Sequence, residues 1–300
     1  MHAIRIGTKA YAAYLCNRFY SKIPDFQIDI PGICVSQERD GNIIFMSLEV
    51  PRQFASPSEK MEHVIRPTAN VLTDLVTEDV YPLMLKKMAS SNYPGLNEEE
   101  IQRLGEQVIK AFWIGAASSR YLTTEVLVGD IMEAGRKSVK NAVFERTFDY
   151  LKDNAEFIVD GFVMFRLKDH VKIMSEALNQ VVEDYLVERD YREFLSLLKY
   201  FVEIQEPKTS VIHVMDSGEA RLKLMDSQGN ELHNEYLDGM AVKGGGDGTL
   251  KEDLLLSTLV TLAPSKIIFH LARDRDIAAN IVTIFEGRVE FCPGCPWCTQ

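Results

Sequence analysis

The chain has 300 residues, of which 46% are hydrophobic and 26% are charged, so it is long enough for about two domains with a substantial core. This composition argues against long disordered tails and against collagen-like or coiled-coil rods. The formal net charge of −11 makes the surface a poor general partner for nucleic acid or for an anionic membrane, because both are bound through Lys and Arg.

The cellular setting is indicated by what the chain lacks. The N-terminus does not have the basic region, apolar core and cleavage site of a secretory signal. The longest strongly apolar stretch, residues 254–263, is too short for a bilayer that needs about 20 residues. We therefore expect a cytoplasmic protein without a membrane span, in which five cysteines, an odd number, are free thiols or metal ligands before they are disulfides.

The sequence predicts that residues 1–55 form a small N-terminal α/β module. Apolar residues between Tyr11 and Phe19 follow helical spacing. Asp40, Gly41 and Asn42 suit a tight hairpin, so the runs on either side of them predict paired strands. Strands are expected at residues 3–6, 26–30 (after Pro24), 33–36 and 43–50.

The sequence predicts that residues 56–206 form a helical domain. Pro67, Pro82, residues 93–95 and Gly115 interrupt the helical pattern, and each is expected to break or kink it. These interruptions predict several packed helices in place of one rod.

Two places in this domain carry more specific signals. Asn97 and Glu100 have the spacing of a reciprocal N-terminal cap, so a helix is expected to begin there. The apolar stripe that runs from Val171 to Tyr185 changes phase near residues 187–190. This change favours a bend or a helical hairpin over a long coiled coil.

The sequence predicts that residues 207–300 form a small C-terminal α/β module that ends in a cysteine-rich tail. Strands are expected at residues 210–215, 220–225, 266–271 and 288–291, and helices at residues 249–263 and 277–285. With a helical centre between two small α/β modules, the fold class is α+β.

The sharpest chemical signal is the spacing of Cys292, Cys295 and Cys298. Two-residue spacing lets neighbouring thiolates turn toward one point, so the three can supply three of four zinc ligands or hold corners of an iron–sulfur cluster. A flexible tail of free thiols is the alternative. Thiol–disulfide exchange is disfavoured, because too few residues follow for a helix whose N-terminus would acidify a thiol. The fourth ligand is left open among Cys34, Cys16, His270, His213, a second copy of the chain and an exogenous ligand.

A second motif, from Gly244 to Thr249, contains the GGDGT string of NAD kinases and diacylglycerol-type lipid kinases. There, glycines bring backbone N–H groups to phosphates at a helix start. The surrounding sequence does not fit those enzymes, so a glycine loop that caps a helix is favoured. An enzyme acting on a phosphate-containing or nucleotide ligand is kept as the alternative, although GxxxxGK[ST], GxSxG and HExxH motifs are absent.

Several segments form an ordered pattern: FVMFRLKD (162–169), YLVERDYREF (185–194), LKYFV (198–202), NEEE (97–100), LLSTL (255–259), LAPSKII (262–268) and IFEGRV (284–289). In these segments the chain resembles the YtxC-like family of sporulation proteins, best from about residue 95 to the end. The resemblance implies an intracellular protein of endospore-forming bacteria and supplies no catalytic residues. We therefore expect a non-enzymatic interaction or regulatory protein with a protein partner, whose Cys292, Cys295 and Cys298 bind zinc or an iron–sulfur centre.

Overall fold

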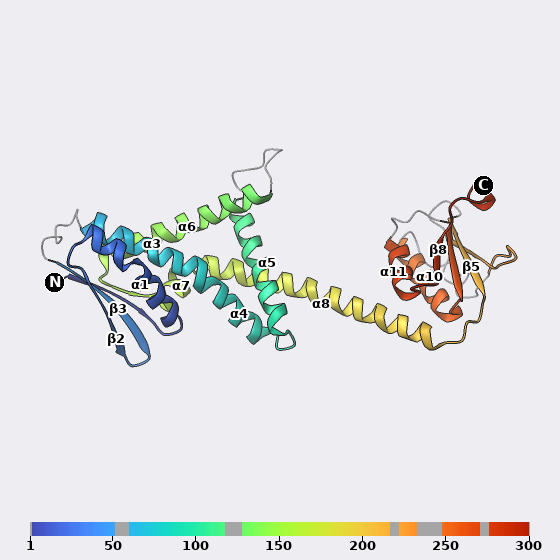
Figure 1. Cartoon of the computed structure of the whole chain (residues 1–300), viewed down its shortest axis with the longest axis horizontal. Helices are drawn as coiled ribbons and strands as arrows, with labels where there is room; N and C mark the ends of the chain where they lie inside the picture. Colours follow the sequence, from blue (N-terminus) through green and yellow to red (C-terminus); the bar gives the residue numbers. More distant parts are fainter. Residues whose placement is uncertain are drawn as a thin grey trace. The chain divides into compact units, whose positions relative to one another are not determined.

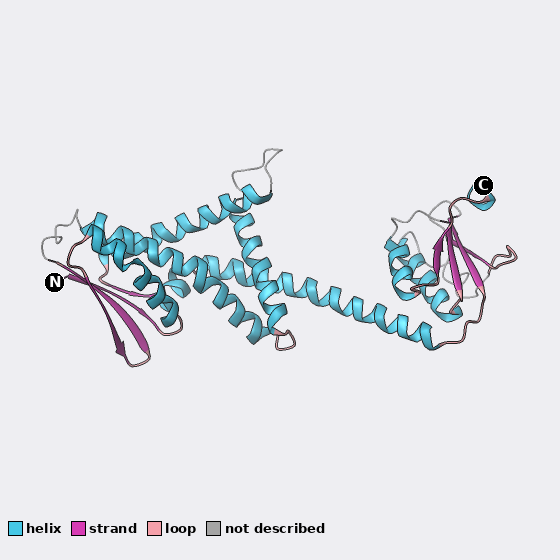
Figure 2. Cartoon of the chain, in the orientation of Figure 1, coloured by secondary structure: helices cyan, strands magenta, loops and turns pink. Residues whose placement is uncertain are grey.

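The computed structural model describes residues 2–51, 60–117, 128–216, 222–232, 248–270 and 276–299 (Figure 1). The chain forms two compact units, Met1–Asp184 and Tyr185–Gln300. Each unit combines helices with one four-stranded sheet, which is the α+β mixture predicted from the sequence (Figure 2). The division into three modules, 1–55, 56–206 and 207–300, stays a prediction.

The sheet of the first unit has the strand order β2-β3-β1-β4. Its strands are β1 (His2–Thr8), β2 (Cys34–Asp40), β3 (Ile43–Val50) and β4 (Glu156–Ile158). β3 pairs antiparallel with both β1 and β2, and β4 pairs parallel with β1. The predicted hairpin is confirmed, because Gly41 joins β2 to β3 with a φ of 56° that glycine adopts without steric cost.

The strand predicted at residues 26–30 is wrong. Helix α1 (Ala12–Asp29) continues through Pro24 and includes most of this run. Phe19 and Phe26 are both buried, and their rings stack with centroids 6.4 Å apart. Two buried rings at a spacing of seven residues share one helix face, so packing outweighs the hydrogen bond that Pro24 removes.

The remaining helical segments of the first unit are η2 (Lys60–Ile65), α3 (Arg66–Asp74), η3 (Leu75–Val80), α4 (Tyr81–Asn92), α5 (Glu98–Ala117), α6 (Val128–Asp153) and α7 (Val159–Arg166). Pro67 and Pro82, which were predicted to break or kink the helix, do not break it, because the chain is helical without interruption from η2 to α4. Each proline lies in the first turn of an α-helical segment, directly after the π-helical turns η2 and η3, where proline is tolerated. Gly115 lies inside α5 and does not end it.

The start of α5 agrees with the sequence. Residues 93–97 separate α4 from α5, as predicted. The backbone N–H of Glu100 donates to the Asn97 side chain over 2.9 Å, and the N–H of Asn97 donates to the Glu100 carboxylate over 2.7 Å. The reciprocal cap is therefore confirmed.

Helix α8 (Lys168–Ile204) is continuous, so the bend or hairpin predicted near residues 187–190 is wrong. Leu178 is buried within the first unit, whereas Val202 belongs to the core of the second. These residues lie on different faces of the helix. The change of phase therefore reflects a change of packing partner along one helix.

The sheet of the second unit has the strand order β6-β5-β7-β8. Its elements are β5 (Val211–Asp216), β6 (Leu222–Met225), α10 (Gly248–Leu262), β7 (Lys266–His270), α11 (Asp276–Ile284), β8 (Val289–Phe291) and the 3₁₀ turn η4 (Pro296–Thr299). β7 pairs parallel with β5 and β8, while β6 pairs antiparallel with β5. The predicted strands and helices of this region are confirmed within one to two residues, apart from the β5–β6 turn, much of which lies outside the described residues.

The core of the second unit lies between this sheet and its helices. Ile212, Ile267 and Phe269 from the sheet and Leu259 and Ile281 from α10 and α11 are completely buried. Among the described residues, no helix has the length and apolar character to cross a membrane.

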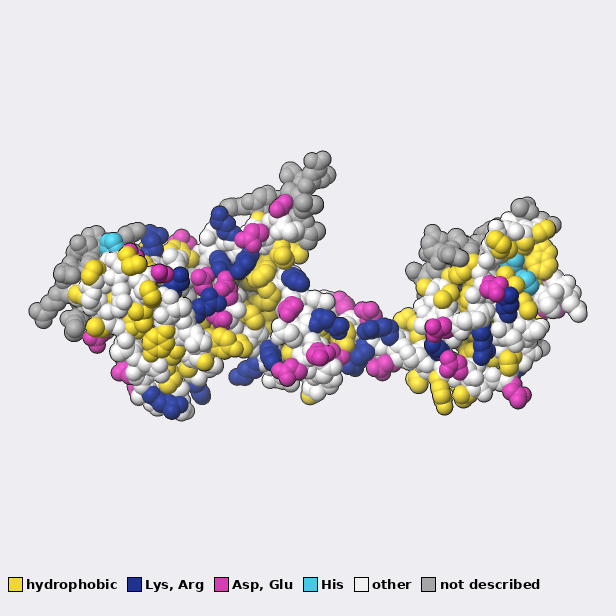
Figure 3. Space-filling model, viewed as in Figure 1, with side chains coloured by type: hydrophobic (Ala, Val, Ile, Leu, Met, Phe, Trp, Pro, Cys, Tyr) yellow, Lys and Arg dark blue, Asp and Glu magenta, His cyan; other side chains and the backbone are white. Residues whose placement is uncertain are grey.

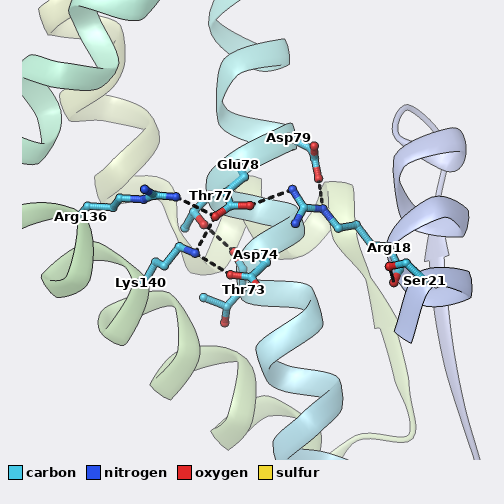
Figure 4. A network of polar contacts seen from close by, with 9 residues as sticks. All are labelled: Arg18, Ser21, Thr73, Asp74, Thr77, Glu78, Asp79, Arg136 and Lys140. Atoms are coloured by element: carbon cyan, nitrogen blue, oxygen red, sulfur yellow. Dashed lines mark hydrogen bonds and ion pairs between the residues drawn. The ribbon is translucent and has the colours of Figure 1, made fainter. Parts of the chain in front are cut away.

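An ion-pair network links elements of the first unit (Figure 4). The Glu78 carboxylate on η3 accepts contacts from Arg18 at 2.9 Å, Arg136 at 3.0 Å and Lys140 at 2.7 Å. Lys140 also contacts Asp74 at 2.7 Å. The network joins α1, η3 and α6, and Figure 3 shows the same interspersion of opposite charges over the drawn surface.

Candidate metal centre

The candidate site is built at one end of the parallel pair β7–β8. β7 ends at His270, and the residue that follows β8 is Cys292. The backbone N–H of Cys292 donates to the carbonyl of Phe269 over 2.8 Å, which continues the pairing of the two strands. Because carboxyl ends of parallel strands lie at the same edge of a sheet, His270 and Cys292 are brought together from distant parts of the sequence.

The tail then folds back on itself. Gly294 has a φ of 121°, a backbone conformation that residues with a Cβ rarely adopt, and its N–H points to the Cys292 sulfur at 3.4 Å. The N–H of Cys298 donates to the carbonyl of Cys295 over 2.9 Å within the turn η4. These local bonds turn the later two thiols toward the first.

Four ligand atoms converge as a result. The sulfur of Cys298 lies 3.7 Å from the sulfurs of both Cys292 and Cys295. Nδ1 of His270 lies 3.2 Å from the Cys298 sulfur and 3.5 Å from the Cys295 sulfur. All four atoms lie within 4.8 Å of one another, so this group could hold a metal ion.

These separations match the edges of a tetrahedron around one ion. With Zn–S bonds of about 2.3 Å and Zn–N bonds of about 2.0–2.1 Å, tetrahedral angles place sulfurs about 3.8 Å apart and sulfur and nitrogen about 3.5 Å apart. The four observed separations, from 3.2 to 3.7 Å, are close to these values. Four of the six separations among the ligand atoms therefore fit a single tetrahedral ion, and all six lie within 4.8 Å.

The side chain of His213 contacts the side chain of His270. Nδ1 of His213 lies 2.9 Å from Nε2 of His270, across the parallel pair β5–β7. The His213 ring also meets the Trp297 ring edge to face, with centroids 4.9 Å apart. When Nδ1 of His270 faces the thiols, its Nε2–H donates to His213, which holds the imidazole in the orientation that a metal ligand needs.

The local electrostatics shift His270 and Cys295 toward the protonation states of ligands. By contrast, the hydrogen bond from the Gly294 N–H lowers the pKa of Cys292, but burial and the two neighbouring thiols outweigh it and leave that pKa raised. Burial lowers the pKa of His270, and the neighbouring His213 lowers it further, so the imidazole is held neutral. Burial of the Cys295 sulfur raises its pKa, but hydrogen bonds from the Trp297 backbone and the neighbouring thiols outweigh burial and leave that pKa below its ordinary value. Metals bind neutral imidazole and thiolate, so both shifts favour coordination.

Among the fourth-ligand candidates, the structure brings only His270 into the group of the three cysteines within the part of the chain that it describes. His213 lies one hydrogen bond away from it. Cys16 and Cys34 belong to the first unit, where the Cys16 sulfur contacts Gln37 and Met46. The sequence carried no signal for the supporting position of His213, since that position depends on strand pairing.

A cavity of about 370 Å³ opens beside the cysteines. Its wall includes Phe291, Pro296 and Trp297, together with the charged residue Glu290.

The other predicted ligand site, from Gly244 to Thr249, lies mostly outside the described residues, and α10 begins at Gly248. The phosphate-binding alternative therefore stays a prediction.

The fold and the site together define a two-unit α+β protein with a Cys₃His group that could hold a metal ion. A family model described as the YtxC-like family matches residues 66–290, more than half of the chain. The chain therefore belongs to the YtxC-like family. The matched region contains His270 and ends just before the three cysteines.

A relative in Bacillus subtilis (strain 168), named Uncharacterized protein YtxC, is 22% identical over 158 residues. The match covers 52% of this chain and 55% of the relative, so the chain spans little more than half of that relative's length. No solved structure matches the chain.

Proposed function

We propose that this protein is a non-enzymatic, cytoplasmic interaction or regulatory protein of the sporulation programme, whose second unit binds one zinc ion. The proposed ligands are Cys292, Cys295, Cys298 and His270. The convergence of their four ligand atoms within 4.8 Å carries the proposal of metal binding. The link to sporulation rests on the resemblance to the YtxC-like family.

Zinc is favoured over an iron–sulfur cluster by the distances between the sulfurs. In a cubane cluster each thiolate binds a different iron at a different corner, so the sulfurs diverge. The Cys298 sulfur lies only 3.7 Å from each of the other two, a separation expected when thiolates share one ion. Three thiolates and one imidazole are also a common zinc donor set.

A structural role for the ion is favoured by the number of ligands. Catalytic zinc sites keep one position open for water or substrate, whereas four protein ligands close the coordination sphere. The ion would tie the tail after β8 to the end of β7, and would present the cavity beside Trp297 as a rigid surface. This arrangement suits a protein that binds a partner.

The proposed cytoplasmic setting suits a metal site built from thiols. All five, Cys16, Cys34, Cys292, Cys295 and Cys298, are free thiols. A compartment that keeps thiols reduced leaves the last three available as metal ligands.

Elemental analysis of anaerobically purified protein, together with a visible spectrum, tests the proposal. We expect one zinc ion per chain and no visible absorption, and a blue-green spectrum after replacement of zinc by cobalt. Cys295→Ser should lose the ion. Cys34→Ser is the matched control, because it removes an exposed thiol of the first unit and should leave the metal content unchanged.

Three results would contradict the proposal. Protein that contains no metal, and whose melting temperature does not change with added zinc or with a chelator, has no metal site. Brown protein with iron and sulfide would replace zinc by an iron–sulfur centre. Robust turnover of a small substrate would refute the non-enzymatic role.

A further inference from the structure

The second half of α8 exposes a continuous apolar surface, which we call the α8 seam. Each of its residues keeps between 49% and 71% of its surface exposed. The α8 seam consists of Val187, Phe194, Leu197, Tyr200, Phe201 and Ile204. Soluble proteins rarely leave so many large apolar side chains on one helix uncovered unless the surface binds something.

The seam has the periodicity of a helix that pairs with another helix. Val187, Phe194 and Phe201 recur every seven residues, and Leu197 and Ile204 follow the later two at a distance of three. This is the a/d pattern of a coiled coil, in which two apolar rows form one narrow stripe. Asp190 occupies the one remaining position of that stripe.

A neighbouring side of this helix segment is already in use. Leu195 and Val202 are buried in the core of the second unit. Asn280 of α11 donates to the Tyr191 hydroxyl over 2.8 Å, and Lys199 pairs with Glu286. These contacts hold α8 against its unit and leave the α8 seam facing away from that core.

We infer that the α8 seam binds the same seam of a second copy of this chain as an antiparallel helix pair. In one antiparallel register, Val187 faces Ile204 of the second copy, Phe194 faces its Leu197, and Asp190 faces its Phe201. The two-fold axis then passes between residues 195 and 196. A parallel pair would place Asp190 of both copies face to face, and two facing carboxylates repel.

The exposed area suits such a pair. With roughly 150–200 Å² for a full large apolar side chain, the exposed fractions of the α8 seam amount to about 600 Å² per chain. Two seams together supply at most about 1,200 Å², the lower end of the range for stable protein–protein interfaces. A second copy brings an equal seam with the same spacing, so one surface supplies both halves of the interface.

Sedimentation equilibrium of the full-length chain over a wide concentration range tests the inference. The wild-type chain should dimerise, and Phe194→Glu should raise the dimer dissociation constant at least about tenfold, because it places carboxylates at the centre of the interface. Ser196→Glu is the matched control. It adds the same charge two residues away, at an exposed position about 160° around α8 from Phe194, and should leave the dimer intact.

Orientation can be tested with a photo-crosslinking amino acid at position 187, which leaves the cysteines untouched. Peptide mapping of the crosslinked dimer should find the segment around Ile204 of the second copy. Circular dichroism should be the same for the wild type and both variants. A wild-type chain that is monomeric at every concentration, a dimer that Phe194→Glu leaves intact, or crosslinks between the two positions 187 would overturn the antiparallel seam.

Discussion

The Tyr81 hydroxyl and Nδ1 of His170 lie 2.7 Å apart, although 89 residues separate them in the sequence. Tyr81 is completely buried and His170 is nearly so. Burial raises the pKa of the Tyr81 hydroxyl, so it stays protonated and donates, and burial lowers the pKa of His170, so its neutral ring accepts. The bond connects α4 to α8 inside the first unit.

Tyr81→Phe should lower the free energy of unfolding by about 1–3 kcal/mol, because it leaves a buried imidazole nitrogen without its partner. Urea denaturation measures the change. Tyr93→Phe is the matched control, since the Tyr93 hydroxyl donates to Asn179 in an exposed contact. The control should cost less than about 1 kcal/mol, and equal losses in both variants would contradict the role of burial.

His170 should make the first unit less stable in mild acid. Burial lowers its pKa in the folded chain, and Asp169 only partly offsets this. The unfolded chain, with a pKa of about 6.5 at this residue, therefore takes up the proton first, and stability is lost as pH falls below that value. Unfolding free energies at pH 7.5 and 5.5, which we expect to differ less in His170→Phe, measure the effect. An equal pH dependence in that variant would assign the loss to other groups.

Glu78 should contribute stability that persists into strong acid. Burial raises its pKa, but Lys140, Arg18 and Arg136 outweigh burial and lower that pKa from 4.5 to about 2. The contribution is therefore complete above pH 4.5 and is lost as pH falls through about 2.

Glu78→Gln should lower the free energy of unfolding at neutral pH by about 1–3 kcal/mol, because three cations lose their shared carboxylate. Chemical denaturation at several pH values checks both the loss and its pH range. Glu176→Gln, which removes an exposed pair with Lys172 at 3.7 Å, should change the free energy by less than about 0.5 kcal/mol. A neutral effect of Glu78→Gln would show that the network contributes little.

Two glycines should respond in opposite directions to alanine. A Cβ at Gly7 would lie 2.6 Å from a ring carbon of Phe45 and 2.9 Å from a methyl carbon of Ile158, so Gly7→Ala should cost about 1–3 kcal/mol. A Cβ at Gly115, inside α5, meets nothing within 4 Å. Gly115→Ala should therefore stabilise the chain by about 0.5–1 kcal/mol, and thermal denaturation of both variants checks the signs.

Local signals in the sequence predicted local structure well. The Asn97–Glu100 cap and the hairpin at Gly41 depend on residues close together in the chain, and both are present. Pro24 misled the prediction. Pro24 lies inside α1 because Phe19 and Phe26 stack in the core, and this gain is visible only in the folded unit.

The candidate site shows the same limit. The spacing of Cys292, Cys295 and Cys298 indicated three ligands, because neighbouring thiols turn toward one point within a short loop. His270 could be named only as one of several candidates, since its place beside Cys292 depends on the parallel pairing of β7 with β8. His213 required the pairing of β5 with β7 as well.

The pairing of β7 with β8 also orders events during synthesis of the chain. His270 is synthesised before Cys298, and α11 lies between the two strands in the chain. An ion caught early by the three thiols would be held by the tail alone, with water or a small thiol in its fourth position. Under the proposed coordination, only closure of the sheet would exchange that transient ligand for the imidazole, so binding of the ion by His270 would follow the pairing of the two strands.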